Sequence, residues 1–336
     1  MKTQAAPGES RANSDVPTFR PFPGLGNPHA QTVGARIRRA RLRPRYRRVR
    51  IDTDDGDFLD LDIRELDRPP VATCLLLHGL EGCAASGYML SSAEAMAARG
   101  VLPVSLNFRS CSGEPNRTLG SYHSGRTDDV RRALAWIDGE HPGLPRGAVG
   151  FSLGGNALLV HMGSAGPAAG LEAAVATSVP YELAECADEL GRGLGRVYGR
   201  YFMRRLKSKL VEKARRFPAD VPERALRSTS VREFDDTFTA PVHGFRDADD
   251  YYERCSAARF VAGVTVPTLL LQASDDPLVP ARSIPLHLIS ANPCLELHMT
   301  ARGGHVGYYG REDRGNRPGW MEGRLADYLA RRLVDV

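Results

Sequence analysis

Short apolar runs alternate with helical stretches along most of this 336-residue chain, and this alternation limits the fold more than any other feature. The run 71–77 is apolar almost throughout, as a strand buried on both faces of a sheet is. Residues 127–138 instead carry apolar side chains at helical spacing. We expect further strands at 101–107, 148–151, 171–177, 266–273 and 295–299, and further helices at 88–99, 153–162, 281–290 and 321–333. The pattern predicts an α/β fold with a mostly parallel central sheet and helices on both faces.

The alternation stops between about residues 180 and 260, where the chain is charged, irregular and interrupted by Phe217-Pro218 and Val221-Pro222. No strand-like run occurs there. We therefore expect a helical cap insertion that lies outside the sheet, over the carboxyl edge of its strands. Residues 21–336 then form one domain that includes this cap, and residues 1–20 form a flexible N-terminal tail.

A basic segment followed by an acidic one dominates the charge pattern. Nine arginines lie between Arg36 and Arg50, and six aspartates follow between Asp52 and Asp62. We interpret residues 45–63 as an antiparallel hairpin with opposite charges paired across its strands and a turn at Asp54-Asp55-Gly56. Because the aspartates would cancel a phosphate-binding face, we expect no nucleic-acid partner. Contact with nucleic acid or an anionic membrane is the less favoured interpretation.

The cysteines and the N-terminus indicate the compartment. The six cysteines are scattered and form no CxxC pair, so neither a zinc site nor a thioredoxin-like site is indicated. Residues 1–17 are polar and lack the apolar stretch of a secretory signal. We therefore expect a cytoplasmic protein with free thiols. No His, Asp or Glu spacing indicates a metal and no GxGxxG follows a predicted strand, so no metal and no other cofactor is expected.

The segment Gly150-Phe151-Ser152-Leu153-Gly154 lies between a predicted strand and a predicted helix. This is the context of a nucleophile elbow, in which a strained turn raises the serine hydroxyl above the sheet. The residues two before and two after the serine lie against neighbouring chain and must be small. We predict that Ser152 is a catalytic nucleophile.

A serine nucleophile needs a base, and the base needs a carboxylate that orients it. His305 follows the last predicted strand, and Asp276 follows the strand before it. Both therefore lie at the carboxyl edge of the sheet, where active sites of open α/β sheets collect. Asp275 is the alternative acid, but we favour Asp276 because the acid in such loops is usually followed by two residues and then Val-Pro. The chain order Ser152, Asp276, His305 predicts a catalytic triad.

An acyl-transfer serine also needs N–H groups that stabilise the oxyanion. The loop Leu77-His78-Gly79-Leu80-Glu81-Gly82 follows the strand before the first helix, where one donor normally arises. The second donor is the residue after the nucleophile, at the start of a helix. We predict the backbone N–H groups of Leu80 and Leu153 as the oxyanion hole. His78 is a candidate for the pocket border, where we expect it to hold the loop by hydrogen bonds rather than to react.

Several further motifs resemble those of one family. They are Asn27-Pro28-His29-Ala30-Gln31-Thr32, the His78 loop, Asn107-Phe108-Arg109-Ser110-Cys111-Ser112-Gly113, Tyr122-His123-Ser124-Gly125 with Asp128-Asp129, Asp275-Asp276-Pro277 and Gly303-Gly304-His305-Val306-Gly307. From about residue 20 to its end the chain resembles the YheT-like, embryogenesis-associated α/β hydrolases, also called the AB-hydrolase 4 family. Ser110 departs from the pattern, because glycine is common there. The resemblance implies an α/β-hydrolase fold that cleaves carboxylic esters with Ser152, Asp276 and His305.

The resemblance also implies a small-molecule or lipid ester as substrate, with short- to medium-chain acyl groups, monoacylglycerols and phospholipids among the substrates of relatives. Some relatives are acyltransferases, and the sequence does not separate the two reactions because they would use the same residues. A non-catalytic scaffold is the third alternative, against which the three intact residues argue. Arg109 follows a strand end and either borders the pocket or ties two loops together. The oligomeric state and the contact of an apolar cap face with a membrane are left open.

Overall fold

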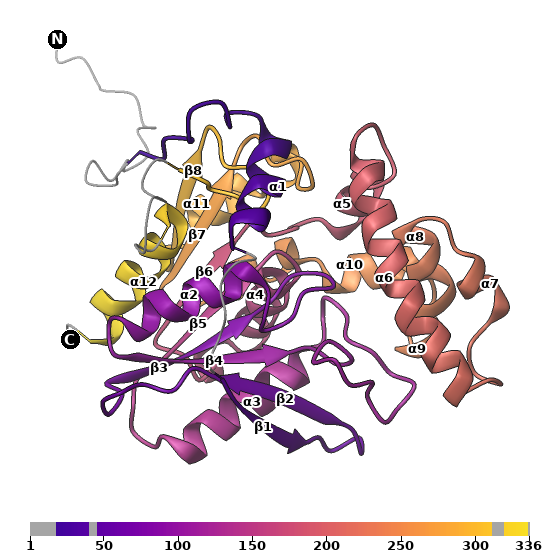
Figure 1. The fold of residues 1–336 in the computed structure, drawn as a ribbon, viewed down its shortest axis with the longest axis horizontal. Helices are drawn as coiled ribbons and strands as arrows, with labels where there is room; N and C mark the ends of the chain where they lie inside the picture. Colours follow the sequence, from indigo (N-terminus) through magenta and orange to yellow (C-terminus); the bar gives the residue numbers. More distant parts are fainter. Residues whose placement is uncertain (1–17, 40–45, 311–318, 335–336) are drawn as a thin grey trace, which may run out of the picture.

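A single eight-stranded sheet runs through the computed structural model, which describes residues 18–39, 46–310 and 319–334 (Figure 1). The strands are β1 (Arg47–Asp52), β2 (Phe58–Ile63), β3 (Ala72–Leu77), β4 (Val101–Asn107), β5 (Arg146–Phe151), β6 (Ala173–Thr177), β7 (Thr268–Ala273) and β8 (Leu295–Thr300). Their order is β1-β2-β4-β3-β5-β6-β7-β8. Neighbours are parallel from β4 to β8, whereas β1, β2 and β4 pair antiparallel. The predicted, mostly parallel sheet is confirmed, and the carboxyl ends of its parallel strands meet at one edge.

The predicted charged hairpin is confirmed by β1 and β2. Arg48 lies opposite Asp62 and Arg50 opposite Asp60 in the register. Both pairs form ion pairs, at 2.6 Å and 2.8 Å. The alternating basic and acidic positions of these two strands therefore neutralise each other. The earlier arginines at 40–45 and the predicted tail up to residue 17 lie outside the described residues.

Helices cover both faces of the sheet, as predicted. Helices α2 (Gly87–Ala97) and α12 (Trp320–Leu333) pack on one face, and α3 (Thr127–Glu140), α4 (Leu153–Ala165) and α11 (Leu286–Ala291) on the other. Strand β3 shows why its sequence is apolar throughout. Leu75 and Leu77 point into the layer of α3 and α4, while Cys74 and Leu76 point into the layer of α2 and α12, because successive side chains of a strand face opposite sides.

Between β6 and β7 the described chain forms helices and loops but no strand. These elements are α5 (Leu183–Glu189), α6 (Gly195–Arg216), α7 (Glu223–Arg227), α8 (Val231–Phe234), the π-helical turn η2 (Asp235–Thr239), α9 (Ala240–Val242), α10 (Ala248–Cys255) and the short turns η3 (Ala257–Arg259) and η4 (Val261–Gly263). We call residues 180–260 the cap. Figure 1 shows α6 to α9 standing to one side of the sheet. Two small apolar clusters hold these helices together.

Two elements differ from the prediction. The helix expected at 281–290 is divided into η5 (Ala281–Ser283) and α11, and Ile284 between them is extended. Pro285 explains the break, because a residue that precedes proline is pushed out of the helical region. Helix α1 (Pro28–Arg39) was not expected at all. Within the described residues, no helix combines the length and apolar character that a membrane span requires.

Candidate active site

Ser152 occupies a sharp turn between β5 and α4. Its φ of 53° and ψ of −121° lie in a region that residues with a side chain rarely adopt. The glycines of the motif make this turn sterically possible. A Cβ on Gly154 would lie 2.4 Å from the carbonyl oxygen of Leu77, and one on Gly150 would lie 2.5 Å from that of Gly154. Any side chain at either position would therefore push the turn away from β3 or from α4.

The hydroxyl of Ser152 meets the imidazole of His305, and the imidazole meets the carboxylate of Asp276. Ser152 Oγ lies 2.9 Å from His305 Nε2, and His305 Nδ1 lies 2.9 Å from Asp276 Oδ2 and 3.1 Å from Oδ1. The Asp276 side chain is buried and also accepts the N–H groups of Leu278 and Val279, at 2.9 Å and 3.1 Å. The carboxylate is thus fixed, and a proton on Nδ1 would leave Nε2 free to accept the serine proton.

Asp275, the alternative acid, points elsewhere. Its Oδ1 accepts the N–H of Gly304 at 2.9 Å, and burial raises the pKa of this carboxyl. The next N–H along, that of His305, donates to Thr32 Oγ1 of α1 at 3.0 Å. Asp275 and α1 therefore hold the loop that carries His305, while Asp276 holds the ring itself.

The loop after β3 lies against the serine. A Cβ on Gly79 would come within 3.1 Å of Ser152 Cβ. The N–H groups on either side of Leu80 are engaged: that of Gly79 donates to Tyr88 Oη at 2.9 Å, and that of Glu81 donates to Tyr122 Oη at 2.8 Å. These bonds fix the backbone around Leu80. Leu80 and Leu153, the predicted oxyanion donors, both line the pocket that contains Ser152 and His305.

His78, predicted for the pocket border, is not among the residues that line the pocket. Its ring turns into the core instead and packs edge-on against Phe108, with ring centroids 4.7 Å apart. Nδ1 donates to the carbonyl oxygen of Gly79 at 2.8 Å, and Nε2 accepts the N–H of Phe108 at 3.1 Å. Burial lowers the pKa of His78 to about 3, so the ring is neutral. It ties the loop after β3 to the end of β4.

Arg109 lies at the pocket wall and between two loops. It lines the pocket, and its buried guanidinium joins three carboxylates. Nη1 lies 2.7 Å from Asp55 and 3.2 Å from Asp57, and Nη2 lies 2.8 Å from Asp129. The side chain therefore connects the turn between β1 and β2 with the start of α3, next to the pocket.

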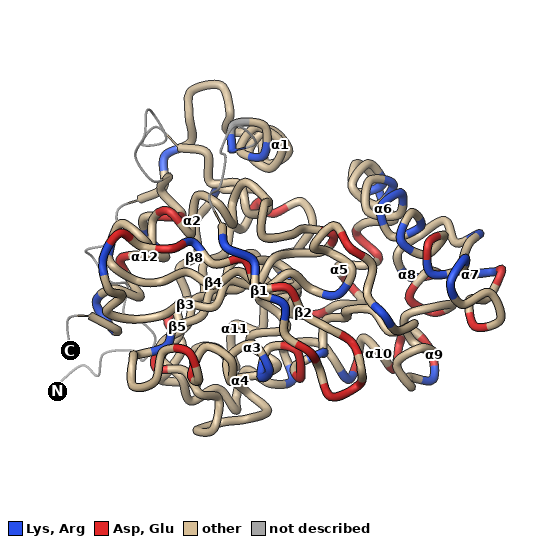
Figure 2. Tube along the Cα trace, turned by 60° about the horizontal axis from the view of Figure 1, so that its bottom comes forward, with Lys and Arg blue, Asp and Glu red and all other residues tan. Residues whose placement is uncertain are grey.

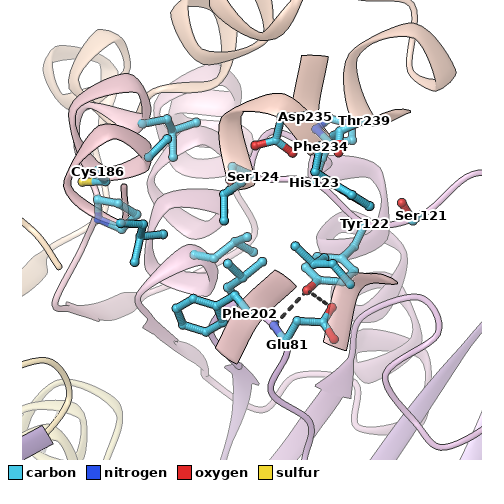
Figure 3. Close-up of a pocket in the computed structure, with 18 of the residues that line it drawn as sticks. Glu81, Ser121, Tyr122, His123, Ser124, Cys186, Phe202, Phe234, Asp235 and Thr239 are labelled. Carbon is cyan, nitrogen blue, oxygen red and sulfur yellow. Dashed lines mark hydrogen bonds between the residues drawn. The ribbon is translucent and has the colours of Figure 1, made fainter. Parts of the chain in front are cut away.

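The pocket extends from Ser152 under the cap (Figure 3). It encloses about 1070 Å³ outside the atoms, part of which is open to solvent. Most of the cap side chains on its wall are apolar: Leu183, Ala187, Leu190, Phe202, Leu206, Leu210, Val231, Phe234 and Phe238. An apolar wall of this kind suits the hydrocarbon chain of an acyl group. In the part of the chain that the structure covers, no group of three or more His, Cys, Asp or Glu side chains is arranged to hold a metal.

A polar cluster of Glu81, Tyr122 and Lys209 beside the oxyanion loop was missed by the sequence analysis. Tyr122 Oη donates to Glu81 Oε1 at 2.8 Å (Figure 3). Lys209 Nζ lies 2.9 Å from the same oxygen. Lys209 is on α6, so the cap contacts the oxyanion loop directly. No local signal could have revealed this pair, because its partners are 128 positions apart in the sequence.

Curated relatives cover most of the chain. It is 38% identical over 322 residues to YheT of Escherichia coli (strain K12), named as an esterase, with 94% of each chain covered. It is 33% identical over 272 residues to phospholipase ABHD3 of Mus musculus, and the aligned region covers 78% of this chain and 66% of that protein. It is 29% identical over 328 residues to embryogenesis-associated protein EMB8 of Picea glauca, and the aligned region covers 93% of this chain and 72% of that protein. No family model matches the sequence.

Solved structures establish the fold. The esterase Pf2001 of Pyrococcus furiosus superposes with a TM-score of 0.56 at 18% identity, over 95% of this chain and all of that one. An acylaminoacyl peptidase of Pyrococcus horikoshii superposes with a TM-score of 0.57 at 14% identity, over 88% of this chain and 43% of that one. Together with the sheet order and the elbow, these likenesses identify an α/β-hydrolase fold. The identity to YheT along 94% of both chains shows that this chain belongs to the YheT-like, embryogenesis-associated branch of the α/β hydrolases.

Proposed function

We propose that the protein is a serine hydrolase that cleaves carboxylic esters through Ser152, His305 and Asp276. The observation that carries the proposal is the continuous hydrogen-bonded chain from Ser152 Oγ through both nitrogens of His305 to Asp276, with 2.9 Å at each step. The names of the relatives agree with it, since YheT is named as an esterase and ABHD3 as a phospholipase. A scaffold protein would have no use for this arrangement.

In the first half-reaction, Ser152 Oγ attacks the ester carbonyl carbon while His305 Nε2 takes its proton. Asp276 holds the imidazole and stabilises the cation that forms. The proton then passes to the departing alkoxide, the C–O bond to the alcohol breaks, and an acyl-enzyme remains. In the second half-reaction, His305 takes a proton from a water molecule as its oxygen attacks the acyl carbon. The bond from that carbon to Ser152 Oγ then breaks, His305 returns the proton to Oγ, and the acid leaves.

The backbone N–H groups of Leu80 and Leu153 serve as the oxyanion hole in this proposal. The Leu153 N–H is at the N-terminus of α4, where the helix dipole favours developing negative charge. The hydrogen bonds on both sides of Leu80 support its role, because donors that are fixed in advance need no reorganisation during the reaction.

The apolar cap wall supports a small-molecule or lipid ester with a medium-length acyl chain as the substrate. A series of p-nitrophenyl esters from C2 to C12 tests this, with Ser152→Ala measured beside the wild type. We expect turnover of the medium chains to exceed that of acetate. Ser152→Ala should lower kcat by ~10³-fold or more, because the three residues act as a unit. Near-normal activity of Ser152→Ala would overturn the assignment.

Acyl transfer to an alcohol is the alternative that shares this acyl-enzyme. Adding a primary alcohol to the same assay and separating acid from new ester decides between the two. We expect acid as the main product. Ester as the main product at low alcohol concentration would identify an acyltransferase, and a wild type inactive toward the whole series would favour a scaffold.

A further inference from the structure

Asp235 lies on the cap wall of the pocket, and within the described residues two hydroxyl groups are its side-chain hydrogen-bond partners. Tyr252 Oη donates to its Oδ2 at 2.7 Å, and the hydroxyl of Thr239 bonds to the same carboxylate. The neighbouring cation, Arg232, pairs with Asp188 and Asp249 instead. The carboxylate of Asp235 is half-buried and lines the pocket, and within the described residues it forms no ion pair.

The two carboxylates on the pocket wall, Glu81 and Asp235, are paired differently. Each fully buried Asp or Glu of the described chain has a basic partner: Asp57 and Asp129 with Arg109, Asp60 with Arg50, Asp62 with Arg48, Glu81 with Lys209, Glu322 with Arg39 and Asp276 with His305. Withdrawing a carboxylate from water without such a partner is unfavourable. Accordingly, burial raises the pKa of Asp235 to about 6. Of the two carboxylates on the pocket wall, Asp235 is therefore the one that forms no ion pair within the described residues and can accept a hydrogen bond from a ligand.

The local backbone brings this carboxylate to the pocket. Asp235 begins the π-helical turn η2, and Asp235, Phe238 and Thr239 of that turn all line the pocket. Single π-helical turns are rare and occur frequently at functional sites. Figure 3 shows Asp235 and Thr239 on the same side of the cavity as His123, apart from Phe202 and Cys186. Asp235 and Thr239 thus interrupt the mostly apolar cap wall of the pocket.

We propose that Asp235, with Thr239 and Tyr252, forms a polar subsite that accepts a hydrogen bond from a hydroxyl group of the substrate. The inference rests on the proposed ester hydrolysis and names its substrate class: esters with a hydroxyl on the acyl chain or on the alcohol portion. A neutral donor fits better than a cation, because Lys209, Lys213 and Arg109 line the same pocket.

Two matched ester pairs test the subsite. In one pair the acyl chain ends in a methyl or a hydroxymethyl group (p-nitrophenyl hexanoate and 6-hydroxyhexanoate). In the other the alcohol is propyl or 2,3-dihydroxypropyl, with a hexanoyl group in both. We expect Asp235→Leu to lower kcat/KM for the hydroxylated member of one pair by about tenfold, the usual effect of losing a hydrogen bond to a charged acceptor. The unhydroxylated member should be nearly unchanged. The pair that responds tells which part of the substrate reaches Asp235.

Glu223→Leu is the matched control, because it removes an exposed carboxylate of the same cap that pairs with Arg227 and not with Arg232. It should leave the preference in both pairs as in the wild type. Equal losses for both members in Asp235→Leu would mean a structural role and overturn the subsite. If Asp235→Leu lowers kcat/KM more for a choline ester than for the hydroxylated esters, the subsite binds a cation rather than a hydroxyl group, and the proposal is overturned.

Two further measurements keep the test decisive. If Asp235→Leu does not fold, Asp235→Asn replaces it, with an expected loss of about threefold because a neutral acceptor remains. Thermal stabilisation by 1,6-hexanediol relative to 1-hexanol needs no turnover. If the difference in Tm between the two alcohols is larger in the wild type than in the variant, the subsite is supported even if ester hydrolysis fails. Equal differences in the two proteins would contradict it.

Discussion

The adjacent carboxylates of Asp275 and Asp276 have different partners, and each partner predicts a different effect of substitution. Asp276→Asn puts a carboxamide against His305 Nδ1 and can hold the ring in the wrong tautomer, so we expect kcat to fall by ~10³–10⁴-fold. Asp275→Asn keeps an oxygen that can accept the Gly304 N–H, so we expect a loss below about tenfold. Kinetics with one p-nitrophenyl ester compare the two variants. The reverse ranking would move the acid to Asp275.

The three residues that the structure brings together at Ser152 were predictable because each lies in a short local motif. The elbow needs two small residues around the serine, and Asp276 and His305 each follow a strand whose position can be read from its apolar run. Glu81 and Asp235 were not predictable. Their chemistry depends on Lys209 and on Tyr252 and Thr239, which only the folded cap brings to them.

Helix α6 fastens the cap to the sheet domain through basic side chains, and Figure 2 shows how densely Lys and Arg follow it. Lys209 pairs with Glu81 of the oxyanion loop at 2.9 Å. One turn further, Lys213 Nζ donates to the carbonyl oxygens of Thr118 and Gly120, both at 2.9 Å. The cap is therefore attached at the loop that would stabilise the oxyanion.

We expect Lys209→Met to destabilise the protein, because it leaves the fully buried Glu81 without its nearest cation. Lys209 is 26% exposed, so the loss should be about 2 kcal/mol, less than for a fully buried pair, and Tm should fall by about 5 °C. Calorimetry measures the shift. Arg204→Met, at an exposed position of the same helix, is the control and should change Tm by no more than about 2 °C. Equal shifts would mean that α6 does not fasten the cap through Lys209.

Elements with a strong local signal were predictable, and those fixed by distant contacts were not. The strands of the parallel sheet are buried on both faces, so their apolar runs predict them, and the charge pattern predicts the hairpin of β1 and β2. Helix α1 carries no such signal: Gln31, in its first turns, is held by the carbonyl oxygens of Leu25 and Tyr309. The π-helical form of η2 has no sequence signature either.

At the scale of the whole molecule, buried histidines predict a loss of stability in acid. Burial lowers the pKa of His78 to about 3 and that of His243 to about 4, and it also lowers that of His123. The unfolded chain binds these protons from about pH 6.5 downward and the folded chain does not. The stability that these residues contribute is therefore complete above pH 6.5 and is lost as the pH falls. His78 alone accounts for about 1.5 kcal/mol between pH 6.5 and 5.

Asp235 acts in the opposite direction, because its raised pKa means that its protonation below about pH 6 favours the folded state. The three histidines outnumber it, so we expect Tm to fall steadily from pH 6.5 to pH 5. Thermal unfolding across this range checks the sign. His243→Gln keeps an acceptor for the Ser121 N–H but does not titrate, so it should flatten the dependence. A Tm that rises toward pH 5 would contradict this account.

The central claim is that Ser152 is the nucleophile, activated by His305, and covalent labelling tests it most directly. The wild type, Ser152→Ala, His305→Gln and Ser121→Ala, whose serine lines the same pocket, are treated with a fluorophosphonate, digested and analysed by mass spectrometry. The account predicts one adduct, on the peptide that contains Ser152, at full yield in the wild type and Ser121→Ala, slow in His305→Gln and absent in Ser152→Ala. An adduct on another residue, or labelling unchanged by Ser152→Ala, would contradict it.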